Sequence, residues 1–509
     1  MPEKFSVIGE IEMEKKGEKG LSRRDYFFMG FGANLGVGWS VSVGSWMLSA
    51  GGVIPAALGF LISFVFIGPV ALCYCELSPM LPVAGGSVAY SYRAFGEKAS
   101  FVAGWVNFGA FITLIPWEAI YLTNILSYLF PILKEGKILY TFAGEEIYLG
   151  TVLIGVVFST LLYLLNRRGA NASAKVQNIL CKTLIVAGFM TIVLGLIGGS
   201  ADNLLPIYER AAGSAGHNSF LGGTFSIVFI AAFYICGFET IPQSIEESKG
   251  DFKDVGKMVL LSVIAACSFY SLIVLTVGLG NPWQETALLP PPVAANVFLY
   301  MFDGWLGKVA WAVVMLGTLC GLFATWNAFM MASPRVLMSL ARVSMVPKVF
   351  AKQNPRTGVP TVGLNICLLF ALAGPFLGLG VIDALTSFGA AAFLLSWGFA
   401  AASLIRLRKT EPELPRPYRI PGGVKTAWFA LLCVTALFVM CFIPGSACYM
   451  GDGACIFFVV WLALGIALFA LNTGERRNIS PEVRKSTMFA GMRSGSDVPS
   501  ENSERMQTR

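Results

Sequence analysis

The residues best suited to chemistry in this sequence stand in an apolar segment that glycine interrupts. Residues 28–52 read FMGFGANLGVGWSVSVGSWMLSAGG, with Asn34 among the glycines near the middle. A break in a membrane helix leaves backbone N–H and C=O groups unpaired, and each costs several kcal/mol unless protein, water or a ligand satisfies it. At the start of the second half-helix, the amides of Gly36, Val37 and Gly38 are therefore a candidate carboxylate site.

A second apolar segment is interrupted in the same way. Residues 222–248 read GGTFSIVFIAAFYICGFETIPQSIEES, with Gly237 near the middle. Carbonyls that end a half-helix suit an ammonium group, and those near Cys236 and Gly237, together with those of Ala33 and Asn34, are candidates for it. The two breaks together would recognise a zwitterion. For either segment alone, the alternative is that its glycines only let neighbouring helices pack closely.

Three charged side chains lie within apolar segments, where a charge costs at least a few kcal/mol and usually marks a pathway or a partner. Glu239 follows the second break, and Glu118 stands in LIPWEAIYLTN. For Glu239 the alternatives are a gating or proton-coupling group and a hydrogen-bonded structural carboxylate. Lys182 is either a coupling group or a side chain that extends to the nearby membrane surface.

Catalysis and metal binding have no foundation in this sequence. The sole histidine is His217, and the 11 cysteines are scattered without paired metal-ligand spacing. We therefore expect no enzyme activity, no metal and no cofactor. Cys448 and Cys455 flank the loop YMGDGA, where the sequence permits a disulfide without requiring one.

The elements that must position these residues are membrane-spanning helices. Hydrophobic residues make up 55% of the 509 and charged residues only 13%, so we expect an all-α integral membrane protein. Apolar runs long enough to span a bilayer number about twelve. The predicted spans are 27–50, 53–79, 101–130, 147–166, 176–199, 220–245, 257–280, 305–333, 360–379, 381–405, 426–444 and 454–472.

Orientation follows from lysine and arginine, which are retained on the cytoplasmic side during insertion. With the N-terminus inside, Lys182 lies within a span, and only Lys134, Lys137, Arg210 and Lys308 of the 37 basic residues fall outside. We expect a multi-pass protein of the cell membrane with both termini cytoplasmic. The net charge of +7 is thus a topology signal that favours membrane lipid as a partner and gives no reason to expect nucleic acid.

The chain is predicted to be one membrane domain between two polar ends, and its first residues lack the apolar core of a cleavable signal peptide. The interrupted segments begin the first and sixth spans, which is the pattern of a five-plus-five inverted repeat with discontinuous helices 1 and 6. The predicted parts are a cytoplasmic tail (1–24), a transmembrane domain (25–473) with repeats at 25–200 and 220–407 and two extra helices in 425–472, and a disordered cytoplasmic tail (474–509).

Six motifs in order resemble those of the amino acid/polyamine/organocation superfamily of secondary transporters, and the likeness covers nearly all of residues 21–472. They are FMGFGANLGVGW, CELSPMLPVAGGSVAYSYRAFG, LNRRGANASAKVQN, GFETIPQSIEESK, SPRVLMSLARVSMVPKVFAKQNPRTGVP and RPYRIPG. The resemblance implies the inverted-repeat fold and transport of amino acids by alternating access. An antiporter and a proton-coupled symporter are both open, with an exchanged substrate or a proton as the second partner.

Two alternatives to amino acid transport are kept. A polyamine or organic amine transporter would share the fold. A channel belongs to another class, and the sequence shows neither the repeated pore-lining charges nor the filter motif that one would need.

The resemblance also assigns roles to single residues. Glu239 matches a position that is often acidic and takes part in gating or protonation. Glu118 resembles a third-span position that lines the pocket beside the side chain of the substrate in arginine and agmatine exchangers. An acid there suits a basic substrate, and a proton-coupling or merely hydrogen-bonded acid is equally open. Phe233 and Trp326 resemble positions whose rings close over the substrate, with core packing as the alternative.

Two positions depart from the family pattern. Some members place serine between the first-helix glycines, where this chain has Val37, so carboxylate binding would rest on backbone amides alone. Proton-coupled members often carry a lysine in the fifth span, where this chain has Leu184. Lys182 stands two residues earlier, on a different helix face. The lysine on which proton coupling usually depends is therefore absent from its usual position.

Charged residues also crowd the loop after the sixth span, opposite the basic loops 342–356 and 406–425. Ion pairs between these loops would hold the cytoplasmic side closed. A solvated loop is the alternative, because exposed pairs contribute little. The loop residues are Glu246, Glu247, Lys249, Asp251, Lys253 and Asp254.

Overall fold

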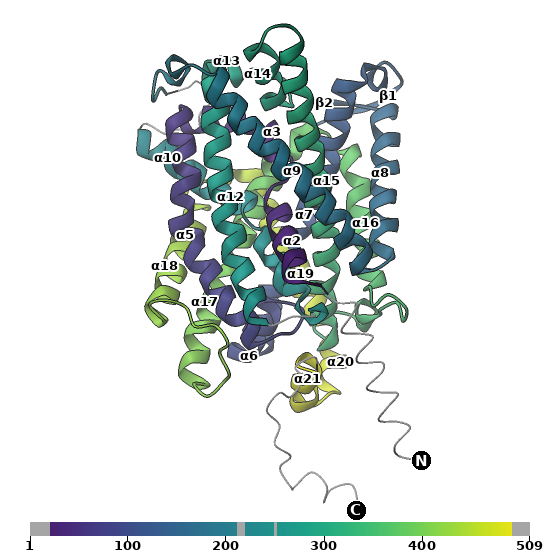
Figure 1. The fold of residues 1–509 in the computed structure, drawn as a ribbon. Helices are drawn as coiled ribbons and strands as arrows, with labels where there is room; N and C mark the ends of the chain where they lie inside the picture. The colour runs from purple at the N-terminus through teal and green to yellow at the C-terminus, as the bar shows by residue number, and fades with distance from the viewer. Residues whose placement is uncertain (1–20, 211–218, 249–251, 491–509) are drawn as a thin grey trace, which may run out of the picture.

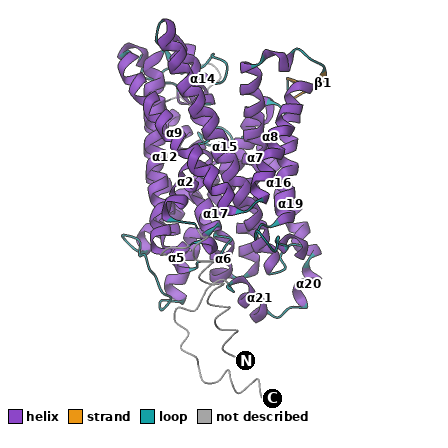
Figure 2. Cartoon of the chain, turned by 45° about the vertical axis from the view of Figure 1, so that its right-hand side comes forward, coloured by secondary structure: helices purple, strands orange, loops and turns teal. Residues whose placement is uncertain are grey.

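The computed structural model describes residues 21–210, 219–248 and 252–490, so His217, Lys249 and Asp251 lie outside the described residues. Within these ranges the chain is a helical bundle with one two-stranded hairpin at one end (Figures 1 and 2). In chain order the elements are α2 (Arg23–Asn34), α3 (Gly38–Val41), α4 (Val43–Ala50), α5 (Val53–Met80), α6 (Ser87–Phe95), α7 (Glu97–Leu129), η1 (Pro131–Lys134), β1 (Ile138–Phe142), β2 (Glu145–Tyr148), α8 (Leu149–Arg167), α9 (Ala170–Gly198), η2 (Ala201–Leu204), α10 (Phe220–Tyr234), η3 (Gly237–Glu239), α11 (Thr240–Gln243), η4 (Ile245–Glu247), α12 (Phe252–Gly280), α13 (Trp283–Thr286), α14 (Val293–Met301), α15 (Gly304–Arg342), η5 (Lys348–Ala351), α16 (Thr361–Ala373), η6 (Gly374–Phe376), η7 (Leu379–Val381), α17 (Ile382–Thr410), α18 (Val424–Met440), α19 (Asp452–Leu471), α20 (Thr473–Arg477) and α21 (Pro481–Met488).

The helices account for the predicted spans. In the described chain, nine helical stretches are long and apolar enough to cross a membrane, and two shorter apolar helices contain α16 and α18. The remaining predicted span is the first, which is divided into α2, α3 and α4. Exposed apolar side chains line the outer helices, such as Val186 and Phe189 on α9 and Val459 on α19. Such a surface is suited to lipid rather than water.

The first span begins at a capping box and is interrupted after three turns. Ser22 donates its N–H to Asp25 Oδ2 over 2.7 Å and accepts from the Asp25 N–H in return, which satisfies two of the free amides at a helix start. The helix stops at Leu35, whose ψ of 69° leaves the helical region. Helical structure resumes at Gly38.

The sixth span shows the second interruption. The helix α10 runs from Phe220 to Tyr234 and is capped by Ser219, whose hydroxyl accepts from the Gly222 N–H over 3.1 Å. The chain then passes through η3, α11 and η4 as single turns. Discontinuous first and sixth helices, as expected from their glycines, are therefore present.

The α2 helix lies in the middle of the bundle in both views (Figures 1 and 2). It contacts α9, α12, α15 and η3. The α7 helix is also enclosed, because 89% of its most apolar stretch is buried inside the protein. The first broken segment, which includes α2, is therefore surrounded by other helices. Its free backbone groups need protein or a ligand around them.

The hairpin is a feature that the all-α expectation lacked. The strands β1 and β2 are antiparallel, with Phe142 opposite Glu145. They are joined by Ala143 and Gly144, whose φ angles of 48° and 84° fit a two-residue hairpin turn. We call this side of the molecule, with β1, β2, α13 and α14, the hairpin end, and the opposite side, with α6, α20 and α21, the α21 end (Figures 1 and 2).

The C-terminal tail differs from its expectation as well. Residues 474–490, predicted to be disordered, contain most of α20 and all of α21. Arg484 Nη2 lies 2.7 Å from Glu97 Oε1 at the start of α7, and Met488 is buried. The helix α21 has only two buried side chains, too few to form an apolar pattern in the sequence, and one of them, Arg484, depends on Glu97 of α7.

The permitted disulfide is not formed. Cys448 and Cys455 are both free thiols, Cys448 buried and Cys455 partly so. Every other cysteine of the chain is also free.

Candidate functional site

The two broken segments meet at Asn34. Its side-chain Oδ1 accepts a hydrogen bond from the Gly237 N–H over 2.6 Å, and its Nδ2 donates to Ser262 O on α12 over 3.3 Å. A Cβ on Gly237 would collide with the backbone of Ala33 and Asn34. Glycine at position 237 is thus needed for the close approach of the two breaks.

The carbonyls that α2 leaves free are partly satisfied by neighbouring helices. Thr325 on α15 donates to Gly32 O over 2.8 Å, and the Tyr270 hydroxyl on α12 donates to Asn34 O over 2.6 Å. In the part of the chain that the structure describes, the amides of Gly36 and Val37 have no hydrogen-bond acceptor. These two donors at the start of the next half-helix are available to an anion.

Glu118 from α7 faces the same break. A Cβ on Gly36 would lie 2.5 Å from Glu118 Oε1, so the carboxyl group is packed directly against this glycine. The side chain is 1% exposed, and neither of its oxygens has a hydrogen-bond partner among the described residues. The Val37 amide approaches it without reaching hydrogen-bond geometry. A buried carboxyl group without a partner is costly, and a proton or a ligand cation would satisfy it.

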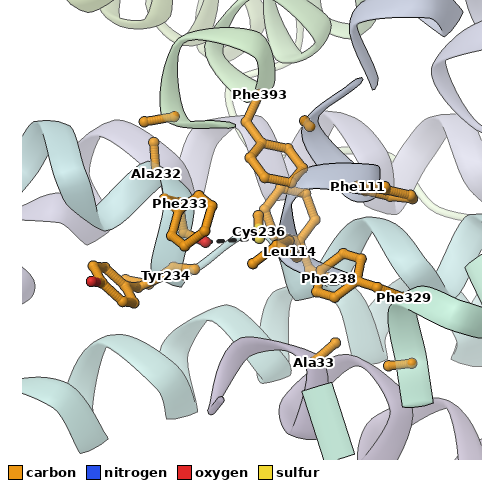
Figure 3. Packing of buried hydrophobic residues seen from close by; sticks show 14 of the residues in the cluster. Ala33, Phe111, Leu114, Ala232, Phe233, Tyr234, Cys236, Phe238, Phe329 and Phe393 are labelled. Atoms are coloured by element: carbon orange, nitrogen blue, oxygen red, sulfur yellow. Dashed lines mark hydrogen bonds between the residues drawn. The ribbon is translucent and has the colours of Figure 1, made fainter. Parts of the chain in front are cut away.

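The carbonyls of the second break are more fully used than those of the first. Cys236 donates its thiol to Phe233 O over 2.9 Å, as the dashed line in Figure 3 shows. The Cys236 carbonyl accepts from the Glu239 N–H over 3.2 Å, and Gly237 O accepts from the Thr240 hydroxyl over 2.7 Å. Each carbonyl has a second lone pair, so these bonds reduce its capacity for an ammonium group without removing it.

Aromatic side chains enclose the breaks on the side of the hairpin end. Phe233 and Tyr234, at the last turn of α10, lie with ring centroids 5.6 and 6.1 Å from that of Trp117. The ring centroids of Tyr234 and Trp46 are 4.8 Å apart. A Cβ on Gly38 would lie 2.5 Å from the Tyr234 ring. Figure 3 shows Phe233 and Tyr234 next to Cys236. The sequence predicted Phe233 and missed Tyr234 and Trp117, although they adjoin Phe233 and Glu118.

Trp326 is not part of this aromatic group. It is fully buried in α15, forms no aromatic pair among the described residues, and its indole N–H has no partner there. Its neighbour Thr325 is the residue that contacts the first break. One step along a helix turns a side chain by about 100°, so a shift of one residue decides which side chain faces the break.

Glu239 lies at the α21 side of the second break and is held by two other helices. The Tyr74 hydroxyl on α5 donates to its Oε1, and Asn107 Nδ2 on α7 donates to its Oε2 over 2.7 Å. The carboxyl group is 1% exposed. It therefore joins three elements that surround the break, and sequence reasoning, which found Glu239, had no signal for Tyr74 or Asn107.

Lys182 lies away from these groups. Its side chain is exposed on α9, and its Nζ is 5.9 Å from the ring centroid of Phe28. Leu184, at the position where some relatives carry lysine, is fully buried. The placement of Lys182 fits a side chain that extends along the surface of the bundle.

Ion pairs close the protein between the breaks and the α21 end. Glu246 receives bonds of 2.8 and 3.2 Å from Arg342 and one of 2.9 Å from the Ala84 N–H. Arg335 Nη2 lies 2.5 Å from Glu247 Oε1. The expected pairing with loop 342–356 is confirmed for Glu246, whose partner Arg342 is the last residue of α15, whereas the partner of Glu247 lies before that loop, two turns earlier in α15.

The second basic loop pairs elsewhere. Arg408 and Arg416 lie 2.5 and 3.3 Å from the buried Glu76 on α5, and Arg93 lies 2.8 Å from Glu411. The expected pairing of loop 406–425 with the loop after the sixth span is therefore wrong for Arg408 and Arg416, and Glu411 of the same loop pairs with an arginine of α6. Glu76 is the nearer acid because α5 runs beside α17 and α18.

A small polar cavity lies beside the Arg335–Glu247 pair. Its volume is about 30 Å³, enough for one or two water molecules. Gln243, Ser244, Glu246, Glu247 and Arg335 line it together with Ala84, Met338, Gln353, Gly358 and Pro360. No group of three or more metal-ligating side chains occurs in residues 21–210, 219–248 and 252–490.

Known proteins match this chain over most of its length. The amino acid permease family matches residues 21–464. The branched-chain amino acid permease BcaP of Bacillus subtilis is 24% identical over 494 residues, 93% of this chain and 98% of that protein. Cationic amino acid transporter 4 of Mus musculus is 27% identical over 426 residues, 81% of this chain and 63% of that protein.

A further relative has another printed substrate. The glutamate/serine transporter AimA of Bacillus subtilis is 26% identical over 412 residues, 77% of this chain and 72% of that protein. The three names agree on amino acids and differ on which ones. The family match covers residues 21–464, which is most of the chain and includes both breaks. The chain therefore belongs to the amino acid permease family and is a membrane transporter rather than an enzyme.

Proposed function

We propose that this protein is a secondary active transporter that binds the zwitterionic backbone of an amino acid at the two breaks and carries it by alternating access. The observation that carries the proposal is the junction at Asn34, which holds two broken helices together. Beside it, the Gly36 and Val37 amides have no acceptor among the described residues. In this proposal the amides of Gly36, Val37 and Gly38 bind the carboxylate, and carbonyls of Ala33 and the second break bind the ammonium group.

The proposed architecture is a five-plus-five inverted repeat. The first repeat runs from α2 to α9 and the second from α10 to α17, with α18 and α19 as the two extra helices. Four spans, α5, α7, α8 and α9, lie between the two broken segments, so these segments run in opposite directions through the membrane. Each break lies in the first span of its half, and these matching positions support an inverted repeat.

We place the protein in the cell membrane, with the α21 end on the cytoplasmic side. Arg342, Lys348, Arg408 and Arg416 belong to connections on the α21 side, and basic residues are retained on the cytoplasmic side. Under this orientation both chain ends are cytoplasmic. Protease protection of tags at the two ends, in sealed right-side-out vesicles, tests it.

Glu118 bears on the substrate class. Its buried, unpartnered carboxyl group favours a substrate with a second positive charge, and the cationic relative supports that reading. A diamine or another organic amine is the second candidate for the same reason. A neutral amino acid, as in the name of the first relative, would leave Glu118 to hold a proton.

The test is uptake into proteoliposomes of labelled arginine, leucine, glutamate and putrescine, each with and without unlabelled substrate inside. Saturable uptake of arginine supports a basic substrate, and dependence on the internal substrate makes the protein an exchanger. Uptake of leucine alone assigns Glu118 to a proton-coupling or structural role. Flux that does not saturate would favour a channel and contradict the proposal.

The coupling mode is proposed to involve Glu239. This carboxyl group joins η3 to α5 and α7, so a change in its protonation would alter contacts between elements that must move. Glu239→Gln is expected to make uptake insensitive to an imposed proton gradient if the protein is a symporter. Lys182→Ala is the matched variant, and loss of the proton dependence in Lys182→Ala but not in Glu239→Gln would give Lys182 the coupling role instead.

A further inference from the structure

We propose that Arg335 and Glu247 form a second binding subsite for the zwitterion, on the cytoplasmic release path. The proposal rests on the transport function and orientation proposed above and adds a step to it. In the closed protein the two side chains bind each other. When this side opens, Arg335 receives the carboxylate of the leaving amino acid and Glu247 receives its ammonium group.

The pair lies on the path from the breaks to the α21 end. Glu247 ends η4, which follows η3 and α11 directly along the chain. Arg335 comes from α15, ten residues after Thr325, which contacts the first break. A substrate that leaves the breaks toward the cytoplasm must pass between these elements.

The surroundings of the pair are polar and incompletely paired. The cavity of about 30 Å³ is bounded by both charged side chains. Gln243 Oε1, Ser244 Oγ and Glu247 Oε2 are buried atoms without a hydrogen-bond partner among the described residues. Buried polar groups without partners are rare, and such groups around a cavity provide contacts for water now and for a polar ligand when the cavity widens.

The chemistry of the pair matches an amino acid. A guanidinium group binds carboxylates through two parallel N–H donors, and Arg335 already presents Nε and Nη2 to Glu247 Oε1 at 3.2 and 2.5 Å. A carboxylate is the natural acceptor for an ammonium group. The internal ion pair thus occupies the positions that the two ends of a zwitterion would take.

Burial gives the substrate a role in opening. The Arg335 side chain is 8% exposed, and its Nη1 is held by the Met331 carbonyl, so it stays enclosed by α15. Glu247 is 33% exposed, so separating the pair leaves mainly the enclosed Arg335 charge without a partner, which is unfavourable. A zwitterion replaces both partners at once, whereas an empty protein must separate the pair without compensation. The subsite therefore favours opening with substrate bound.

A neighbouring pair provides a matched control. Arg342 and Glu246 join the same two elements, α15 and η4, over 2.8 Å. Glu246 lines the cavity but Arg342 does not, so the control changes Arg342 alone and leaves Glu246 in place with its bond from the Ala84 N–H. If both pairs only hold the protein closed, removing either should have the same kind of effect.

The experiment compares two variants in proteoliposomes with labelled arginine and leucine as probes. Arg335→Gln with Glu247→Gln removes the proposed subsite, and Arg342→Gln breaks the control pair without changing a residue that lines the cavity. Half-saturation is measured from the external and the internal face for each probe that the unmodified protein transports. Failure of the unmodified protein to transport either probe would contradict the proposed function itself.

The expected result is a rise of at least about tenfold in the internal relative to the external half-saturation for the Arg335/Glu247 variant, as loss of charged hydrogen bonds implies. The Arg342→Gln control should change the internal and external half-saturation by a similar factor. An unchanged ratio in the first variant, or the same change in both variants, overturns the proposal. If the first variant does not fold, Arg335→Lys replaces it, because lysine keeps the charge and loses the paired donors. The ratio of internal to external half-saturation then tests the proposal in the same way.

Discussion

At the scale of single residues, Gly36 illustrates how a missing side chain makes a site. Its position is bounded by Glu118 Oε1 and by Thr325 Oγ1, at 2.5 and 3.0 Å from where a Cβ would stand. No side chain fits there without displacing one of these two groups. The glycine therefore keeps both a free amide and the approach to a buried carboxyl group.

Gly36→Ala is expected to reduce amino acid uptake at least about tenfold, equivalent to roughly 1.4 kcal/mol of lost binding. The added methyl group pushes against Glu118 and blocks the approach of a carboxylate to the amide. Proteoliposome uptake measures the loss. Gly136→Ala is the control, because a Cβ there meets nothing within 4 Å, and similar losses in both variants would refute the assignment.

At the scale of elements, the two broken helices depend on each other. The amide of Gly237 at the second break has its acceptor in the first break, at Asn34 Oδ1. Asn34 also reaches α12 through Ser262 O. The breaks are therefore one structural unit built from three elements.

Asn34→Ala is expected to lower the free energy of unfolding by about 1–3 kcal/mol, because it leaves the buried Gly237 N–H without an acceptor. Thermal unfolding of the purified protein in detergent measures this change. Asn171→Ala, at an exposed position of α9, serves as the comparison and should be neutral. A midpoint for Asn34→Ala equal to that of Asn171→Ala would show that the bond contributes nothing.

The docking of α21 is the second prediction at this scale. Arg484 is buried against Glu97, whereas the adjacent Lys485 is exposed. Arg484→Ala is expected to release α21 and to speed hydrogen exchange of its backbone amides. Lys485→Ala should leave exchange unchanged, and equal exchange in the two variants would mean that the ion pair does not hold the helix.

At the scale of the whole molecule, the α21 end is closed by charges that link distant parts of the chain. Burial alone would raise the pKa of Glu246, but the hydrogen bond and charge of Arg342, together with the Ala84 N–H, hold that pKa below its usual value. A pKa that is lower in the folded than in the unfolded state adds stability above the unfolded value. That stability is lost as pH falls through the folded pKa.

Glu246→Gln is therefore expected to lower the midpoint of thermal unfolding at neutral pH and to have progressively less effect below about pH 4.5, near the ordinary glutamate pKa. The measurement is the unfolding midpoint of both proteins across the acid range. The effect should be modest, because the pair is partly exposed. A difference between the two proteins that persists unchanged in acid would contradict the role of this charge.

The membrane class, the positions of the spans and both breaks were predictable from the sequence. These features are local: apolar runs must be long enough to cross a bilayer, and the glycines of each break stand within a few residues of one another. The sequence also identified Glu239 and Glu118, because a carboxylate in an apolar run is costly wherever the run lies.

Which residues contact one another could be learned from the tertiary structure alone. Asn34 and Gly237 are 203 residues apart, and Asn107 and Glu239 are 132 apart. Whether Thr325 or Trp326 faces the first break depends on the rotation of α15 about its axis, which sequence spacing does not fix. The partner of Glu247 and the docking of α21 likewise depend on surfaces that exist only after distant helices have packed together.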